Sequence, residues 1–273
     1  MTAQQEKGRV FRALHESSGA FLIPNPWDAG TARLLAALGF EALATTSAGY
    51  AFSVGKRDGT IERGEMMEHL AAIALATDLP VSADLENGFG DAPETVSETI
   101  HLAAQAGVVG GSIEDRSRGA ESAIYELGYA ADRVRAAAEA AHGLAFPFTL
   151  TARAENFLAS RPDLADTIRR LQAYQEAGAD VLYAPGLARR EDIAAVVREV
   201  DRPVNVVMGL QGVQLSQAEL AAIGVRRISV GSALSRAALG AFLRAAREMR
   251  EHGTFAFADE AVSYRDLSTM FQP

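Results

Sequence analysis

Two acidic clusters each follow a short apolar stretch typical of a buried strand. Asp84 and Glu86 lie in LPVSADLENGFGD, and Glu114 and Asp115 lie in VVGGSIEDRS. Carboxylates that follow apolar strands, with glycines around them, occur where a parallel α/β protein builds its active site. Because no histidine or cysteine accompanies them, these oxygen ligands favour a hard divalent cation, Mg²⁺ with Mn²⁺ as the alternative.

Composition limits the function classes. The chain has 273 residues, of which 48% are hydrophobic and 22% charged, so it can bury a large core. Its net charge of −9 argues against nucleic-acid binding, which needs basic patches. Cysteine is absent, which excludes disulfides, thiolate metal sites and a cysteine acid or base. The N-terminus lacks a signal-peptide core and no apolar run approaches the roughly 18 residues of a membrane helix, so we expect a cytoplasmic protein without membrane contact.

Short apolar runs alternate with longer helical patterns along the chain. The runs that predict strands are Phe21–Pro24, Ala42–Thr46, Val81–Asp84, Val108–Glu114, Phe148–Ala152, Val181–Ala184, Val204–Val207 and Arg227–Val230. Helices are predicted at Ala29–Leu38, Arg63–Ala76, Ala92–Ala106, Asp132–Ala141, Leu164–Ala177, Arg190–Val200, Ser216–Ala222 and Ala233–Glu251. Eight such units in a chain of this length favour an α/β fold of the (β/α)₈ TIM-barrel type over an open doubly wound sheet.

One joint between helix and strand recurs. Gly39, Gly107, Gly178 and Gly224 each follow a predicted helix, where glycine relieves a left-handed backbone conformation. No Gly/Ser/Pro-rich linker divides the chain, so we expect a single barrel domain over residues 1–273. Its helical C-terminal extension ends in a tail, 252–273, that is aromatic-rich and expected to pack on the barrel or on a neighbouring subunit.

The loops after the strands lie on the catalytic face of a barrel. A metal ion there can bind a 2-oxo acid through the carboxylate and ketone oxygens of the acid. The TSAGY segment would add backbone N–H groups and the Ser47 hydroxyl, which can stabilise an enolate oxygen. Arg153 can pair with a second carboxylate or a phosphonate in a two-pronged contact. The candidate positions in these loops are Asn25, Trp27, Asp28, Thr46, Ser47, Ala48, Gly49, Tyr50, Arg57, Asp58, Asp84, Glu86, Glu114, Asp115, Arg153, Glu155, Asn156, Tyr183, Asn205, Gly231 and Ser232.

Several of these residues also have simpler explanations. A carboxylate after a strand is often a helix cap or a surface ion-pair partner, and Trp27 and Tyr50 could be core aromatics. All five histidines fall within or at the ends of helical patterns, so we expect them on the outer surface. GSALSRAALG after the last strand could cradle a phosphate, or Gly231 could simply allow close packing.

Together these residues resemble the isocitrate lyase/phosphoenolpyruvate mutase superfamily. The stretches NPWDAGTARLLAALGFEALATTSAGYA, GKRDG, PVSADLENGFGD, GSIEDR, TARAENF and VNVVMG occur in family order, from about residue 20 to 235. The resemblance implies a (β/α)₈-like barrel, an Mg²⁺ cofactor and an enolate of a 2-oxo acid, often in a homotetramer with exchanged C-terminal helices. By position it implies metal binding by Asp84, Glu86 and Glu114, a place near the metal's waters for Asp58, an oxyanion loop at Ser47 and Gly49, and substrate contacts from Arg153 and Asn205.

The chain departs from the family's lyases and mutases in the loop after the fourth strand. Where the lyases carry K-K/R-C-G-H, this chain reads RSRGAESAIYELGYAADR, and the P-K-T-N-S-like loop of the mutases is also absent. Glu86 stands where aspartate is commoner. Glu121, Tyr125 or Arg118 could replace the missing acid.

These observations favour an Mg²⁺-dependent lyase. Its substrate would be a small 2-oxo or 2-hydroxy carboxylic acid, cleaved at a carbon–carbon bond or decarboxylated as oxaloacetate is. In this hypothesis Asp58, Arg153 and Ser47 are catalytic. The substrate would contact Trp27, Thr46, Ser47, Ala48, Gly49, Tyr50, Arg153 and Asn205. The alternatives are a phosphonate P–C mutase or hydrolase, and a barrel that binds a carboxylate without turnover. The partner in each case is a small carboxylate, with a homo-oligomer (tetramer or dimer) expected.

Overall fold

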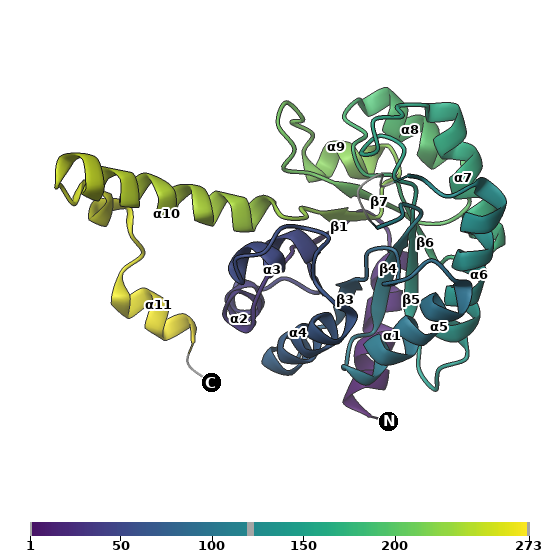
Figure 1. The fold of residues 1–273 in the computed structure, drawn as a ribbon, viewed down its shortest axis with the longest axis horizontal. Helices are drawn as coiled ribbons and strands as arrows, with labels where there is room; N and C mark the ends of the chain where they lie inside the picture. The colour runs from purple at the N-terminus through teal and green to yellow at the C-terminus, as the bar shows by residue number, and fades with distance from the viewer. Residues whose placement is uncertain (1, 119–122, 272–273) are drawn as a thin grey trace.

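The computed structural model describes residues 2–118 and 123–271, within which eight parallel strands form a barrel surrounded by helices (Figure 1). The strands are β1 (Phe21–Ile23), β2 (Leu43–Ala44), β3 (Val81–Asp84), β4 (Gly110–Glu114), β5 (Thr149–Arg153), β6 (Val181–Tyr183), β7 (Val204–Val207) and β8 (Arg227–Ser229). Their order is β1-β8-β7-β6-β5-β4-β3-β2. The Ala44 N–H donates to the Pro24 carbonyl at 3.1 Å, which brings β2 against the end of β1. The predicted (β/α)₈ TIM-type barrel is confirmed.

The predicted helices all form, with ends that shift by a few residues. They are α2 (Ala29–Ala37), α4 (Arg63–Ala76), α5 (Pro93–Gln105), α6 (Leu127–His142), α7 (Leu164–Glu176), α8 (Arg190–Glu199), α9 (Gln217–Ala222) and α10 (Ala233–His252). Capping explains several starts; for example, the Asp28 carboxylate accepts the Thr31 N–H at 2.6 Å. The glycine joint is confirmed, because φ is 84°, 97°, 107° and 93° at Gly39, Gly107, Gly178 and Gly224.

The sequence patterns missed the N-terminal helix α1 (Ala3–Glu16), which closes the bottom of the barrel. Phe11 on this helix is fully buried and packs in a cluster with Phe21, Ile23 and Val109. Gly110 makes room for it, since a Cβ at that position would lie 2.7 Å from the Phe11 ring. This packing turns the floor of the barrel into a second small core.

Helix α3 (Ser47–Ser53) replaces the loop expected for the TSAGY segment. Thr46 is its N-cap, and the Thr46 hydroxyl accepts the Gly49 N–H at 3.2 Å. A Cβ on Gly49 would lie 2.6 Å from the Thr46 methyl group and 3.1 Å from the Trp27 Cβ. Only glycine therefore fits at position 49, between Thr46 and Trp27. This close packing holds α3 next to the carboxyl end of β2.

The C-terminal extension leaves the barrel body. Helix α10 points away from the barrel, and the chain then turns through η1 (Ala256–Glu260) into α11 (Tyr264–Met270), which contacts α2 (Figure 1). Large apolar side chains are exposed here, including Phe242 at 66% and Tyr264 at 89%. The expected packing of 252–273 against a neighbouring subunit stays a prediction. No helix in the described parts of the chain is long and apolar enough to cross a membrane.

The expectation that the histidines lie on the outer surface is wrong for two of them. His15 on α1 and His69 on α4 are both buried. His15 packs edge-on against Phe11 and Phe21 in the barrel floor, and His69 stacks on Tyr50 with ring centroids 3.7 Å apart. Burial lowers the pKa of His15 to about 3 and that of His69 to about 4, so both rings are neutral core residues.

Candidate active site

The carboxyl ends of β3, β4 and β5 bring the predicted acids together around one arginine. Asp84, Glu114 and Arg153 are the last residues of these strands, and Glu114 is paired in register with Arg153. The Arg153 guanidinium forms ion pairs of 3.0 Å with Asp84, 3.1 Å with Glu114 and 2.8 Å with Glu155. All four side chains are largely buried. Arg153 is therefore fully committed to carboxylates of the protein itself.

Two acids at this site, Glu86 and Glu114, hold their protons more tightly than isolated acids do. Burial raises the pKa of Glu86 to about 7, although Arg118 opposes the shift. Burial also raises the pKa of Glu114 well above its usual value, against the effect of Arg153. For Arg153, burial works against the charged form, but the surrounding carboxylates raise its pKa overall. The cluster therefore carries more carboxylate than its arginines neutralise, and an added cation would favour its ionised form.

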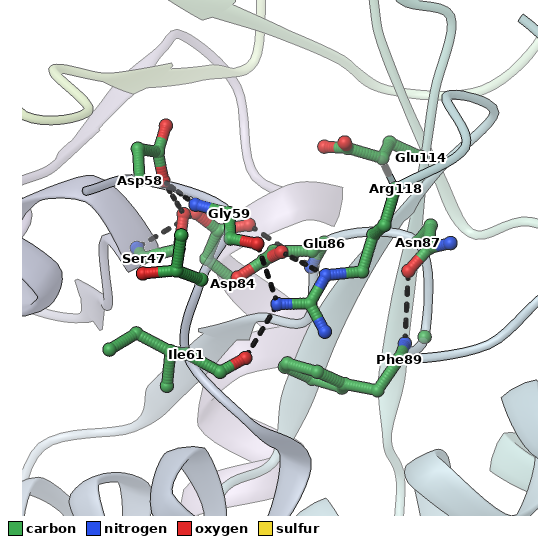
Figure 2. Close-up of polar contacts among 12 residues, drawn as sticks. Ser47, Asp58, Gly59, Ile61, Asp84, Glu86, Asn87, Phe89, Glu114 and Arg118 are labelled. Carbon is green, nitrogen blue, oxygen red and sulfur yellow. Dashed lines mark hydrogen bonds and ion pairs between the residues drawn. The ribbon is translucent and has the colours of Figure 1, made fainter. Parts of the chain in front are cut away.

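Asp58 and Ser47 extend the cluster toward β2 (Figure 2). The Ser47 hydroxyl donates to Asp58 Oδ1 at 3.3 Å, and the Ser47 N–H donates to Asp84 Oδ2 at 3.0 Å. Burial and the nearby Asp84 raise the pKa of Asp58. Because the N–H groups of Ser47 and Gly49 already have acceptors, an oxyanion role for them would require a change of hydrogen-bond partner. That role stays a prediction.

Glu86 approaches Arg118 from the loop after β3 (Figure 2). Arg118 Nε lies 3.1 Å from Glu86 Oε2, and its guanidinium also donates to the carbonyls of Gly59 at 3.0 Å and Ile61 at 2.5 Å. Glu86 has a φ of 49°, an unusual conformation for a residue with a side chain, and such strain concentrates at functional sites. Arg118 thus ties the segment that carries Asp58 to the loop that carries Glu86.

The buried Arg133 of α6 holds that β3 loop in its unusual shape. Its guanidinium donates to the carbonyls of Asn87, Gly90 and Asp91, the Gly90 bond being 2.9 Å long. Asn87 is buried, and a buried carbonyl left without a partner is costly. Arg133 therefore fixes the backbone on which Glu86 stands.

The acids fit a hydrated cation better than a closed cage of ligands. Among the described residues, no three His, Asp or Glu side chains lie close enough to hold one metal together. Glu86 Oε1 is nevertheless buried without a hydrogen-bond partner in the described parts of the chain. Mg²⁺ usually keeps several waters and takes one or two carboxylates directly, so this oxygen-only donor set suits it. Direct binding by Asp84, Glu86 and Glu114 together stays a prediction.

A cavity of about 200 Å³ opens beside the acids and reaches across the barrel mouth. Of the predicted substrate-binding residues, those lining it are Thr46, Ser47, Ala48, Arg153 and Asn205. Trp27, Gly49 and Tyr50 do not line it; Gly49 packs against Trp27, and Tyr50 stacks on His69. At the far side, the Asn205 amide donates to the Ser229 hydroxyl at 3.1 Å.

Two supporting residues were only weakly indicated by the sequence. Glu155, two positions after Arg153 in TARAEN, is 2% exposed and pairs with that arginine. Asp115 accepts from the Glu155 N–H at 2.8 Å and pairs with Arg170 at 3.1 Å, so it orients its neighbours and does not face the cavity. Their adjacency to predicted site residues is the signal that could have ranked them higher.

The structure describes two of the three residues that could replace the missing catalytic acid in the loop after β4. Glu121 lies outside the described residues. The Tyr125 hydroxyl donates to Asp91 at 2.5 Å and does not line the cavity, while Arg118 is paired with Glu86. Neither Tyr125 nor Arg118 is placed as a free proton donor.

Comparisons with known proteins agree with this geometry. A family model described as phosphoenolpyruvate phosphomutase matches residues 11–250. The crystal structure of a protein from Burkholderia cenocepacia J2315, provisionally described as a lyase/mutase, has a TM-score of 0.97 and 63% identity, covering 99% of this chain and 97% of that one. The crystal structure of 2,3-dimethylmalate lyase has a TM-score of 0.85 and 26% identity, covering 99% and 94%. The oxaloacetate decarboxylase of Chromohalobacter salexigens is 30% identical over 91% of this chain and 87% of that protein.

Proposed function

The chain belongs to the phosphoenolpyruvate phosphomutase family, as its motifs indicated, and from this premise we propose that it is an Mg²⁺-dependent lyase. It would break a carbon–carbon bond of a small 2-oxo or 2-hydroxy acid by way of an enolate. The observation that carries the proposal is the group of buried carboxylates with raised pKa values, Asp58, Glu86 and Glu114, which line a cavity of about 810 Å³. Shifted acids that converge on one cavity are typical of active sites.

The residues of the acidic cluster divide into separate roles. Asp84 and Glu86 would hold the cation, and Glu114 and Asp58 would accept hydrogen bonds from its waters. When bound, Mg²⁺ supplies Lewis-acid stabilisation of negative charge on substrate oxygens. Arg153 keeps Asp84 and Glu114 in place, because its ion pairs leave it little capacity for a distal carboxylate.

Asp58 is our candidate for moving a proton. Both of its described hydrogen bonds, from the Ser47 hydroxyl and from the Gly59 N–H, fall on Oδ1. Its Oδ2 is therefore the oxygen that can exchange a proton with a ligand in the cavity that Asp58 lines. The raised pKa of Asp58 suits this task, since a general acid or base works best when its pKa lies nearer the working pH.

A second candidate reaction is decarboxylation of oxaloacetate, which the 30% identical decarboxylase favours. It would use the same acids and would pass through the enolate of pyruvate. P–C bond chemistry gains no support from the contacts of Arg153, and it stays an alternative that turnover of phosphonopyruvate would detect.

The test is deuterium exchange into the methyl group of pyruvate, followed by ¹H NMR with Mg²⁺ and with EDTA. We expect exchange that requires Mg²⁺, and Mg²⁺-dependent binding of oxalate, an enolate mimic, by calorimetry. A panel of dicarboxylates and phosphonopyruvate then shows which bond breaks. Oxalate binding without exchange or turnover would indicate a binding protein, and no oxalate binding would overturn the proposed function.

A further inference from the structure

The interior of the barrel is hollow below its mouth. Barrel interiors are usually filled by bulky branched side chains. Here the cavity of about 200 Å³ that Ser47 lines at the mouth extends inward, where small side chains of four strands line it: Ala44, Ala83, Ser112 and Ser229. Arg227, the first residue of β8, lines the same cavity. One long cationic side chain therefore reaches into a space that apolar side chains fill in other barrels.

The side-chain contacts of Arg227 in the described parts of the chain are with neutral groups. Arg227 is 4% exposed; its Nη1 donates to the Thr151 hydroxyl at 3.0 Å, and its Nη2 lies 3.5 Å from the Ser82 hydroxyl. The guanidinium carbon lies 5.8 Å from the centre of the Phe11 ring, at the floor of the barrel. Nε is buried without a hydrogen-bond partner among these residues. Because Ser82 and Thr151 each lie two positions before the end of their strands, the guanidinium lies deeper in the barrel than the acidic cluster.

The positive charge of Arg227 is not compensated by the protein. No carboxylate lies within ion-pair distance of Arg227 in the parts of the chain that the structure describes. Burial lowers the pKa of Arg227 to about 10, so the side chain stays protonated at neutral pH. Burial also raises the pKa of the neighbouring Tyr183 and lowers that of His15 to about 3, so both of these side chains are neutral. Water can complete the hydrogen bonds of a buried cation but cannot neutralise it, and an unpaired buried charge is costly.

We propose that Arg227 binds a small monovalent anion, such as chloride, inside the barrel. The anion would accept a hydrogen bond from Arg227 Nε, and the Ser112 hydroxyl, which lines the same cavity, can add a second donor. It would supply the one negative charge that the surroundings of this arginine lack. The site is independent of the proposed function, because none of the residues assigned there to metal binding or proton transfer takes part in it.

The free donor of Arg227 suits a spherical anion. Carboxylates pair with arginine through two parallel hydrogen bonds. Nη1 and Nη2 already face hydroxyl groups, which leaves Nε as the nitrogen without an acceptor among the described residues. A halide needs no second fixed donor, and it fits a polar cavity of about 200 Å³ together with waters. Because Ser47 at the barrel mouth lines the same cavity, an anion can enter from solvent without unfolding the barrel.

Thermal unfolding without Mg²⁺ tests the site, with sodium chloride compared with sodium gluconate at equal ionic strength. Chloride that binds only the folded chain should raise the midpoint by about 2–4 °C and then saturate, whereas the larger gluconate should not raise it. Arg227→Met should lose the chloride response. The matched control is Arg236→Gln, which alters an exposed arginine that lines the same cavity from the first turn of α10, and it should keep the response. An equal response to chloride and gluconate would overturn the proposal, as would a response that only Arg236→Gln removes.

A second measurement uses the unaltered protein, because the burial of Arg227 makes folding sensitive to its substitution. Crystals soaked in sodium bromide would reveal bound bromide by its anomalous scattering. We expect a peak inside the barrel next to Arg227 Nε. Water alone at that position, with bromide only on the outer surface, would overturn the proposal. Neither measurement uses Mg²⁺ or a substrate, so failure of this site and failure of the proposed function are distinguishable.

Discussion

Two regions of the barrel carry uncompensated charge of opposite sign. Around the ends of β3 to β5, carboxylates outnumber Arg153 and Arg118, and burial, helped by the neighbouring carboxylates, raises the pKa values of Glu86 and Glu114. Arg227, the first residue of β8, and Arg236, in the first turn of α10, line the cavity of about 200 Å³ without a carboxylate partner among the described residues. The first region therefore favours a cation, and the second favours an anion.

The largest expected effect comes from removing Arg153, the arginine at the centre of the acidic cluster. Arg153→Met would leave Asp84, Glu114 and Glu155 buried without their common partner. We expect the free energy of unfolding to fall by about 3–5 kcal/mol, because breaking a buried ion pair strands the remaining charges. Urea unfolding would measure the loss, and Mg²⁺ should restore part of it. The surface variant Arg135→Gln, whose Asp132 pair is exposed, should change stability little. An unchanged stability in Arg153→Met would mean that the acids do not depend on this arginine.

Asp84→Asn should abolish the chemistry of the acidic cluster while leaving the fold largely intact. Its carboxylate receives the Ser47 N–H and pairs with Arg153, so the amide can keep the shape but not the charge. We expect pyruvate exchange to fall by about 10²- to 10³-fold, the range found when one stabilising group is lost from an active site. Asp132→Asn on the outer face of α6 is the control. Full exchange activity in Asp84→Asn would show that the metal lies elsewhere.

The pH dependence of Mg²⁺ binding follows from Glu86. Burial raises its pKa from 4.5 to about 7, so the folded protein without metal holds a proton there that the unfolded chain releases. This proton stabilises the folded state below about pH 4.5, and the contribution is lost as the pH rises through about 7. Mg²⁺ must displace it, so affinity should increase up to about tenfold per pH unit until pH 7 and then level off. Calorimetry across this window would check the slope, and a flat profile would contradict the shift.

The smallest expected effect is a change in Mg²⁺ affinity on substitution of Arg118, the arginine that pairs with Glu86. Its ion pair with Glu86 competes with an incoming metal ion, although Arg118 is 24% exposed and partly screened. Arg118→Gln should therefore tighten Mg²⁺ binding about two- to fivefold above pH 8, where Glu86 is ionised. Arg63→Gln on α4, which removes an exposed ion pair with Glu98, should have no effect. Weaker binding in Arg118→Gln would show that this arginine organises the metal site instead of competing for it.

Much of the fold was predictable because it depends on local patterns. Apolar runs of strand length, helical periodicity and the glycines at the helix ends place all eight strands within a few residues of their observed bounds. The acids Asp84 and Glu114 were also predictable, since side chains that directly follow barrel strands must face the mouth. Helices α1 and α3 were not predicted. Phe11 on α1 and Gly49 on α3 are fixed by packing against segments that are distant in the sequence.

By itself, the sequence determined the barrel, the family and the identity of the acids, since strand periodicity and short motifs depend on neighbours along the chain. Only the tertiary structure decided how their charges are shared. Residues 69 positions apart, Asp84 and Arg153, meet through strand register, and the same register sets Arg227 beside Asn205 with no acid in reach among the described residues. Burial of His15 and the raised pKa of Glu86 likewise depend on the loss of water around them, which no local pattern encodes.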